Sequence, residues 1–327
     1  MREERGPRSD AEDAEETIGQ GAGLKSCTYK REKPMAIATT TAGEYRQADL
    51  HGGPALRFSD VSVGFDEGEV LRGVSFEVAE RETLVLLGET GTGKTLTLKL
   101  AAGLLRPSAG KVEVLGEEVS AMSEKELLAF RRRIGFVFQE GALFDSMTVE
   151  ENVAYRLREE GVAEEEIAPR VEEVLDFVEL GHTQGMLPSE LSGGMRRRVS
   201  IARALVSRPE IVLYDSPTAG LDPVTSQTII TLILRLRDFY GVTSLLATHR
   251  LQDGFALANF RFDAAEKSVV RNAVGAGAGA ITRFMVYKHL EGVNEAGNEG
   301  YDNGIYFAGT PNEVMNSKDP YIRRFLV

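Results

Sequence analysis

The segment Gly88–Thr95 restricts the fold of this chain more than any other feature of its sequence. It reads Gly-Glu-Thr-Gly-Thr-Gly-Lys-Thr and fits the pattern G-x-x-x-x-G-K-[ST]. The continuously apolar run Thr83–Leu87 precedes it and predicts a strand buried on both faces of a sheet, and the helical pattern of Leu96–Leu104 follows it. Because the N–H groups of such a loop point at phosphate oxygens, the segment predicts a nucleoside triphosphate site.

Side chains in and beyond this loop complete the predicted phosphate site. Lys94 adds positive charge and Thr95 a hydroxyl for Mg²⁺, whereas Glu89 is expected to point away from the anionic ligand. A second apolar strand, Ile211–Tyr214, ends in Asp215, at the end of the sheet where ligands bind. Taken alone, such an aspartate is more often a helix cap or turn residue, but downstream of a phosphate loop it predicts Mg²⁺ coordination. The predicted phosphate-binding residues are Gly88, Glu89, Thr90, Gly91, Thr92, Gly93, Lys94 and Thr95.

A Ser-Gly-Gly turn gives a second anion site, because Leu191–Met195 leads into a helix predicted to run through Ala204. The plainer interpretations are a flexible turn and, for the arginine run 196–198, a solvated helix face. Together with the preceding motifs, however, Leu191–Met195 resembles the signature motif of the ABC ATPase family. The resemblance implies that Ser192, Gly193 and Gly194 touch the γ-phosphate of ATP held by the opposite subunit, in a head-to-tail dimer with two sandwiched ATP molecules.

Four further motifs occur in the family's order, and the match extends from Leu56 to about His249. Phe65 resembles the aromatic residue that stacks on adenine, Gln139 the Q-loop residue, Asp222 part of the D-loop, and His249 the switch histidine. Each has a plain alternative by itself, such as a core phenylalanine or a satisfied loop histidine. The resemblance implies catalytic roles for Lys94, Gln139, Asp215, Ser216 and His249, and a Mg²⁺ environment of Thr95, Gln139 and Asp215.

Two segments look like a particular branch of the family. Phe138–Phe144, followed by Met147–Val153, is similar to the ATPases of Mla-type phospholipid transporters, which work with lipid-binding proteins of the mammalian-cell-entry type. Met195 in the signature and the C-terminal segment Gly309–Leu326 favour the same branch. The resemblance implies a phospholipid or another hydrophobic cargo.

One position departs from the family pattern. A glutamate usually follows the magnesium aspartate and polarises the attacking water, but this chain has Ser216 after Asp215. A hydroxyl orients water yet does not accept its proton at neutral pH, and loss of a general base typically costs about 10²–10⁴ in rate. The sequence therefore predicts ATP binding with slow hydrolysis, supported by His249 or by a partner ATPase with an intact site.

The pattern of elements predicts an α/β fold: a P-loop NTPase core with an antiparallel β subdomain and an inserted α-helical subdomain, the ABC ATPase arrangement. Residues 1–54 are predicted to be a disordered tail, with Met35 as an alternative start, and residues 55–327 to form the ATP-binding domain. Capping boxes at Ser123 and Thr148 predict two helix starts, and the helical subdomain is expected over about 120–194. The C-terminal part, about 281–327, is predicted to hold two paired strands, Arg283–Lys288 and Gly304–Ala308, around a surface loop, Glu291–Gly304, and then a helix that begins at Thr310.

Charge and hydropathy limit the partners. The formal net charge of −12 disfavours nucleic acid, and the single cysteine, Cys27, excludes an intrachain disulfide and suits a reducing cytoplasm. No apolar stretch reaches the ~20 residues of a membrane span, and the N-terminus lacks the apolar core of a secretory signal. The expected location is the cytoplasmic face of the cell membrane, reached through integral-membrane permease subunits, with a second ATPase subunit that is either identical or different.

Two other functions stay open on the sequence alone. A soluble ABC ATPase of repair or translation is disfavoured by the absence of a long coiled coil and of a second ATPase cassette. An ATP-binding regulatory subunit without turnover is kept open by Ser216.

Overall fold

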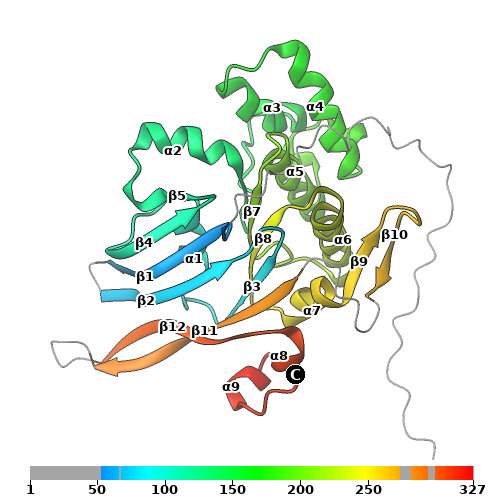
Figure 1. Ribbon diagram of the computed structural model, residues 1–327. Helices are drawn as coiled ribbons and strands as arrows, with labels where there is room; N and C mark the ends of the chain where they lie inside the picture. Colours follow the sequence, from blue (N-terminus) through cyan, green and yellow to red (C-terminus); the bar gives the residue numbers. More distant parts are fainter. Residues whose placement is uncertain (1–52, 66–67, 273–280, 294–298, 327) are drawn as a thin grey trace, which may run out of the picture. The chain divides into compact units, whose positions relative to one another are not determined.

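The computed structural model describes residues 53–65, 68–272, 281–293 and 299–326 (Figure 1). Except for Gly53 and Pro54, the predicted tail lies outside the described residues, as do Cys27 and Met35. The Gly-Ala run 275–280, whose composition predicts a surface loop, also lies outside them.

Four of the strands form an antiparallel sheet with the order β2-β1-β4-β5. They are β1 (Leu56–Phe65), β2 (Gly68–Val78), β4 (Ala109–Val114) and β5 (Glu117–Glu118). Phe58 of β1 stacks on Phe76 of β2 with 4.6 Å between ring centroids. The predicted antiparallel β subdomain is confirmed.

Six strands form the central sheet, in the order β12-β11-β3-β8-β7-β6. They are β3 (Thr83–Leu87), β6 (Ile134–Val137), β7 (Ile211–Asp215), β8 (Thr243–Thr248), β11 (Thr282–Val293) and β12 (Glu299–Gly309). All neighbours pair in parallel except β11 and β12. Val85 and Leu87 of β3 belong to one hydrophobic cluster and Leu84 and Leu86 to another, so the strand is covered on both faces, as its apolar run predicts.

The helices pack against the sheets and contribute buried residues to the two clusters (Figure 1). They are α1 (Lys94–Ala101), α2 (Glu124–Phe130), α3 (Val149–Glu159), α4 (Glu164–Phe177), α5 (Gly193–Leu205), α6 (Pro223–Tyr240), α7 (Leu251–Asn259), α8 (Pro311–Met315) and α9 (Pro320–Arg323). The predicted capping boxes are present at Ser123, Thr148 and Thr310. Among the described residues, no helix is both long and apolar enough to cross a bilayer.

The predicted boundaries of the helical subdomain are wrong at the N-terminal side. Residues 120–194 include β6, which pairs in parallel with β7 as the outer strand of the central sheet. Leu127 and Phe130 of α2 belong to the cluster beneath the antiparallel sheet, whereas α3, α4 and α5 contribute to the other cluster. A four-residue apolar run between helices does not show its period, so only the pairing with β7 identifies it as a strand.

The C-terminal hairpin is longer than the sequence predicts. The predicted pairing of Arg283–Lys288 with Gly304–Ala308 is present, but β11 continues to Val293 and β12 begins at Glu299, where a surface loop was expected. Glycine and polar residues are depleted in strands on average, but their main-chain N–H and C=O groups can still form the ladder. A further hairpin of β9 (Phe260–Asp263) and β10 (Ser268–Arg271) was not predicted.

Candidate nucleotide-binding site

The loop between β3 and α1 takes a conformation that requires glycine. Gly88, Gly91 and Gly93 have φ values of +155°, +87° and +94°. A Cβ atom at Gly88 would lie 2.7 Å from Thr92 Oγ1 and 2.8 Å from the carbonyl oxygen of Tyr287. Side chains at these positions would therefore force the loop out of this conformation.

The Lys94 ammonium group lies over this loop. Its Nζ donates to the carbonyl oxygens of Gly88 and Glu89, at 2.8 and 2.6 Å, and to Thr92 Oγ1 at 3.3 Å. The side chain is 9% exposed, and burial lowers the pKa of Lys94 to about 8 against the attraction of Asp215 and Glu89. Phosphate oxygens would supply the negative charge that the carbonyl acceptors lack, so the site favours an anionic ligand.

The side chains of Thr95 and Asp215 are hydrogen-bonded to each other at the edge of the central sheet. Thr95 Oγ1 donates to both carboxylate oxygens of Asp215, at 3.0 and 3.2 Å. Hydroxyl and carboxylate oxygens are the hard donors that Mg²⁺ prefers when phosphate oxygens and water complete its shell. The residues present therefore fit that ion. Within the described ranges, no group of three or more His, Cys, Asp or Glu side chains is placed to hold a metal ion.

One open cleft of about 330 Å³ is lined by four of the five predicted catalytic residues, all except Asp215. Its lining consists of Thr90, Gly91, Gly93, Lys94, Thr95, Leu96, Gln139, Ser216 and His249. Gln139 follows β6, Ser216 follows β7 and His249 follows β8. Three parallel strands of the central sheet therefore bring these side chains to the same edge. The lining contains no carboxylate among the described residues, and Asp215, which bonds to Thr95, is buried. A general base of the glutamate type is thus missing from the cleft.

Ser216 directly follows Asp215, at the position where the family resemblance implies a glutamate. Its φ of +46° lies in the left-handed region, where a non-glycine residue is strained. The conformation is held by two hydrogen bonds: Ser216 N donates to the carbonyl oxygen of Ala247 at 2.8 Å, and Ala219 N donates to that of Ser216 at 3.0 Å. Because Ser216 already carries a Cβ atom in this conformation, a longer side chain at the same position adds no further backbone strain.

The remaining predicted residues lie outside the cleft lining. Phe65, at the end of β1, is 53% exposed. Ser192 caps α5 by accepting a bond from Met195 N at 3.2 Å, and Gly193 and Gly194 begin that helix. All three signature residues are thus absent from the lining of the chain's own phosphate cleft.

Asp222 caps α6 in the same way. Its Oδ1 accepts bonds from the N–H groups of Val224 and Thr225, each at 3.0 Å, and Oδ2 accepts one from Thr225 Oγ1 at 2.5 Å. The hydroxyl bond from Thr225 is the largest contribution to the lowered pKa of Asp222. A Cβ on Gly194 would overlap the Thr225 side chain, so the starts of α5 and α6 approach closely.

Two arginines that sequence reasoning did not single out connect α5 to the Gln139 segment. Arg197 is buried and donates to the carbonyl oxygen of Phe138 at 2.7 Å. Arg203 donates to those of Gly141 and Ala142, at 2.9 and 2.8 Å. Burial lowers the pKa of both guanidinium groups.

The interpretation of the arginine run as a solvated face is therefore wrong for Arg197. This residue shares a helix face with the buried Ser200, Ile201 and Ala204, at i+3, i+4 and i+7. This spacing in the sequence could have indicated that Arg197 lies on the buried face of the helix.

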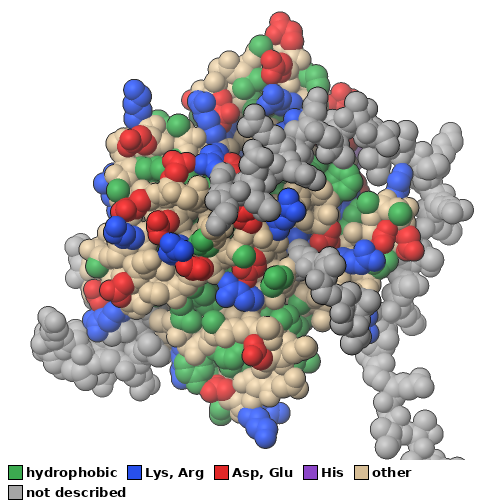
Figure 2. Space-filling view, viewed as in Figure 1, with side chains coloured by type: hydrophobic (Ala, Val, Ile, Leu, Met, Phe, Trp, Pro, Cys, Tyr) green, Lys and Arg blue, Asp and Glu red, His purple; other side chains and the backbone are tan. Residues whose placement is uncertain are grey.

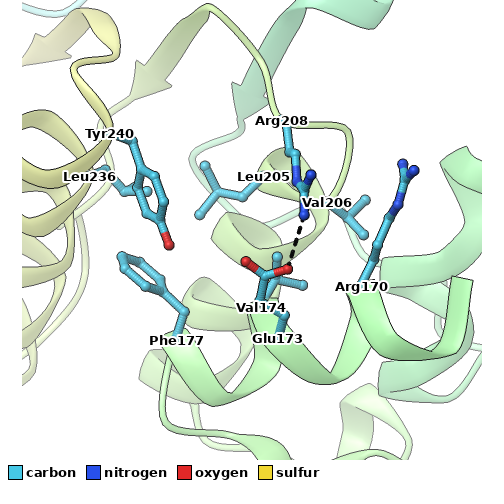
Figure 3. Close-up of a pocket in the computed structure, with 9 residues that line it drawn as sticks. All are labelled: Arg170, Glu173, Val174, Phe177, Leu205, Val206, Arg208, Leu236 and Tyr240. Carbon is cyan, nitrogen blue, oxygen red and sulfur yellow. Dashed lines mark hydrogen bonds and ion pairs between the residues drawn. The ribbon is translucent and has the colours of Figure 1, made fainter. Parts of the chain in front are cut away.

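A second hollow lies among α4, α5 and α6 (Figure 3). It is lined by Arg170, Glu173, Val174, Phe177, Leu205, Val206, Arg208, Leu236 and Tyr240. Arg208 pairs with Glu173 at 3.3 Å, and the volume of about 20 Å³ is close to that of one water molecule. This hollow is a packing feature rather than a ligand site.

The chain has the ABC ATPase fold. Residues 71–219 match the family model described as ABC transporter. The solved dimeric structure of the ATP-binding cassette MJ0796, in a post-hydrolysis state bound to ADP and Pi, is 26% identical with a TM-score of 0.62 and covers 78% of this chain and 98% of that one. cbiO1 from Clostridium perfringens, part of the transporter complex cbiONQ, is 24% identical with a TM-score of 0.64, over 81% of this chain and 92% of that one, and supports the fold alone.

Curated relatives carry the name methionine import ATP-binding protein MetN. The one from Rhizobium johnstonii is 37% identical over 217 residues, which are 66% of this chain and 60% of that protein. The one from Carboxydothermus hydrogenoformans is 42% identical over 179 residues, 55% of this chain and 53% of that protein. The chain thus spans little more than half the length of these relatives, and their names do not support the phospholipid branch that the sequence motifs favoured.

Proposed function

We propose that this chain is the ATP-binding and ATP-hydrolysing motor subunit of an ABC transporter. The observation that carries the proposal is the single cleft in which the phosphate loop, Gln139, Ser216 and His249 meet, with the Thr95–Asp215 pair beside it. In this role Lys94 and the loop N–H groups bind the triphosphate, and Thr95 and Asp215 hold Mg²⁺. Gln139 and His249 then contact the γ-phosphate side of the cleft, and Phe65 receives the adenine.

A second ATPase subunit completes the site in this proposal. Ser192–Gly194 form an exposed helix N-terminus that the chain's own cleft does not include, and a helix N-terminus favours phosphate. A second copy, facing the first in the opposite direction, brings this N-terminus to the ATP. The relative MJ0796 was solved as a dimer.

The permease partner is proposed to bind next to the Gln139 segment. Phe144 and Tyr155 are 41% and 36% exposed, and their rings lie 4.8 Å apart. Arg203 donates to the carbonyl oxygen of Ala142 and lies over the Phe144 ring. An exposed aromatic pair that is fixed in this way is typical of a protein–protein contact. Docking there places the chain on the cytoplasmic face of the membrane.

For the cargo, the relatives' names favour methionine import over phospholipid transport with a mammalian-cell-entry-type partner. The identity covers only 60% and 53% of the length of those two proteins, so the cargo has to be assigned by reconstitution of the chain with its permease. ATP turnover stimulated by methionine, but not by phospholipid, supports methionine import, and the reverse result supports the phospholipid branch.

A slow, ATP-gated regulatory subunit is the second candidate, because the cleft lining among the described residues has no carboxylate. A nucleic-acid ATPase has no comparable support: on the face shown in Figure 2, acidic and basic side chains are interspersed rather than gathered by sign.

The decisive experiment measures Mg·ATP binding and hydrolysis by the wild type, Lys94→Ala, Ser216→Glu and Ser216→Ala. Lys125→Ala, which removes an exposed lysine on α2, is the control for Lys94→Ala. Turnover that Lys94→Ala abolishes and Ser216→Glu raises supports the motor. ATP binding without wild-type turnover, together with rescue by Ser216→Glu, supports the gated subunit. Failure of the wild type to bind ATP refutes both.

A further inference from the structure

Asp253 is a buried carboxylate that the proposed chemistry does not use. It is the third residue of α7, is 3% exposed and does not line the cleft. Its Oδ2 accepts hydrogen bonds from the hydroxyl of Thr218 and from that of Thr248, the latter at 3.4 Å. Arg250 Nε lies 3.8 Å from Oδ1.

The two threonines lie close in sequence to Ser216 and His249, two of the residues that line the cleft. Thr218 lies two residues after Ser216, on the loop that follows β7, and Thr248 is the last residue of β8, directly before His249. One carboxylate oxygen therefore connects both loops. The Thr248 hydroxyl also accepts a bond from Arg250 N at 3.0 Å, so its orientation toward Asp253 is fixed.

Arg250 extends this connection to α6. It donates to Ser226 Oγ at 2.9 Å and to the carbonyl oxygen of Thr218 at 3.4 Å. Asp222 caps the N-terminus of the same helix.

Burial of this carboxylate is unfavourable in itself, and burial raises the pKa of Asp253. Hydrogen bonds offset such a cost only while the donors keep their distances and angles. A relative shift of the two loops would break one of the two hydroxyl bonds and leave the carboxylate poorly solvated. Asp253 thus resists any displacement of His249 relative to residue 216.

We propose that Asp253 is a positioning residue that holds His249 in register with residue 216 across the cleft, through Thr218 and Thr248. This inference rests on the proposed ATPase function. It implies that the loss of Asp253 impairs turnover far more than ATP affinity, because Lys94 and Thr95 bind the nucleotide from a different element. Misplacement of a catalytic group by about 1 Å costs about 10²-fold in rate.

The test uses the full chain with Asp253→Ala, Asp253→Asn, Thr218→Val and Thr218→Ser, in the wild-type and the Ser216→Glu backgrounds. We expect Asp253→Ala to lower kcat about 10- to 100-fold with KM within about threefold. Asp253→Asn and Thr218→Ser should recover most of kcat, because an amide oxygen still accepts both bonds and serine keeps the hydroxyl. Asp238→Asn removes a partly buried carboxylate paired with Arg237 elsewhere and controls for general destabilisation.

Hydrogen–deuterium exchange gives a second measurement that does not depend on turnover. Asp253→Ala should raise exchange in peptides 216–221 and 248–252 together, whereas Asp238→Asn should leave both unchanged. The proposal is overturned if only one of these peptides responds, if kcat is unchanged, or if Asp253→Asn and Thr218→Ser lose as much kcat as Asp253→Ala and Thr218→Val. Failure of the motor proposal appears separately, as an absence of ATP binding or of its sensitivity to Lys94→Ala.

Discussion

Replacement of Lys94 by methionine should change how the stability of the nucleotide-free protein depends on pH. The ammonium group is almost fully buried, and burial lowers the pKa of Lys94 to about 8 from the ordinary lysine value of 10.5. The difference corresponds to about 3 kcal/mol, because one pH unit is worth about 1.4 kcal/mol. This free energy is the disadvantage of the charged form in the folded chain, and methionine fills a similar volume without it.

The direction of this pH dependence follows from the number of protons that Lys94 binds in the folded and in the unfolded chain. Between pH 8 and 10.5 the unfolded chain holds more protons on Lys94 than the folded chain, so the free energy of unfolding of the wild type rises with pH in that window. Lys94→Met has no such group. The stability of the wild type relative to Lys94→Met should therefore increase by about 3 kcal/mol from pH 7 to pH 10.5, while other titrating groups cancel in the difference.

Urea unfolding at pH 7, 8, 9 and 10, without nucleotide, measures this difference. Lys125→Met controls for the loss of an exposed lysine. Added Mg·ATP at about 100 times its Kd should stabilise the wild type by about 2.7 kcal/mol at pH 7 and Lys94→Met by far less. If the stability curves of the wild type and Lys94→Met run parallel across the whole range, Lys94 is not a desolvated cation and the argument for its affinity toward phosphate fails.

Three further changes test the geometry of the site. Gly93→Ala should abolish ATP binding in a titration with a fluorescent nucleotide, because its Cβ would overlap the Leu71 side chain at a φ of +94°; unaltered affinity would contradict the required curve of the loop. Asp222→Ala should lower the free energy of unfolding by about 1 kcal/mol through loss of the α6 cap, whereas Asp222→Asn should retain most of it in the same urea assay. Arg197→Met should lower kcat with little change in ATP affinity, because the hydrogen bond beside Gln139 is lost; a change confined to affinity would speak against that role.

Sequence patterns predicted the parts of the fold that depend on interactions between residues close together in the chain. Capping boxes at Ser123, Thr148 and Thr310 start helices because each pair of side chains satisfies its own backbone donors within four residues. Glycines of the phosphate loop encode a backbone curve directly through their φ angles. These features required no knowledge of the rest of the chain.

Features that depend on distant partners were missed or misplaced. The strand β6 is too short to show a period, and its identity comes from pairing with β7, more than seventy residues away in the sequence. The β9–β10 hairpin and the extension of β11 were also missed, since a backbone ladder places few demands on side-chain type.

The residues of the candidate site show the same difference between features set by nearby residues and features set by distant ones. The sequence by itself determined which residues are predicted to bind the nucleotide, because a phosphate loop and its companion motifs combine fixed residue types with fixed spacings. Only the tertiary structure decided which residues hold them in place, such as Arg197 behind Gln139 and Asp253 between Thr218 and Thr248. An isolated arginine or aspartate in a sequence reads as a solvated charge, and it becomes a support only when folding removes its water and leaves named donors and acceptors as its partners.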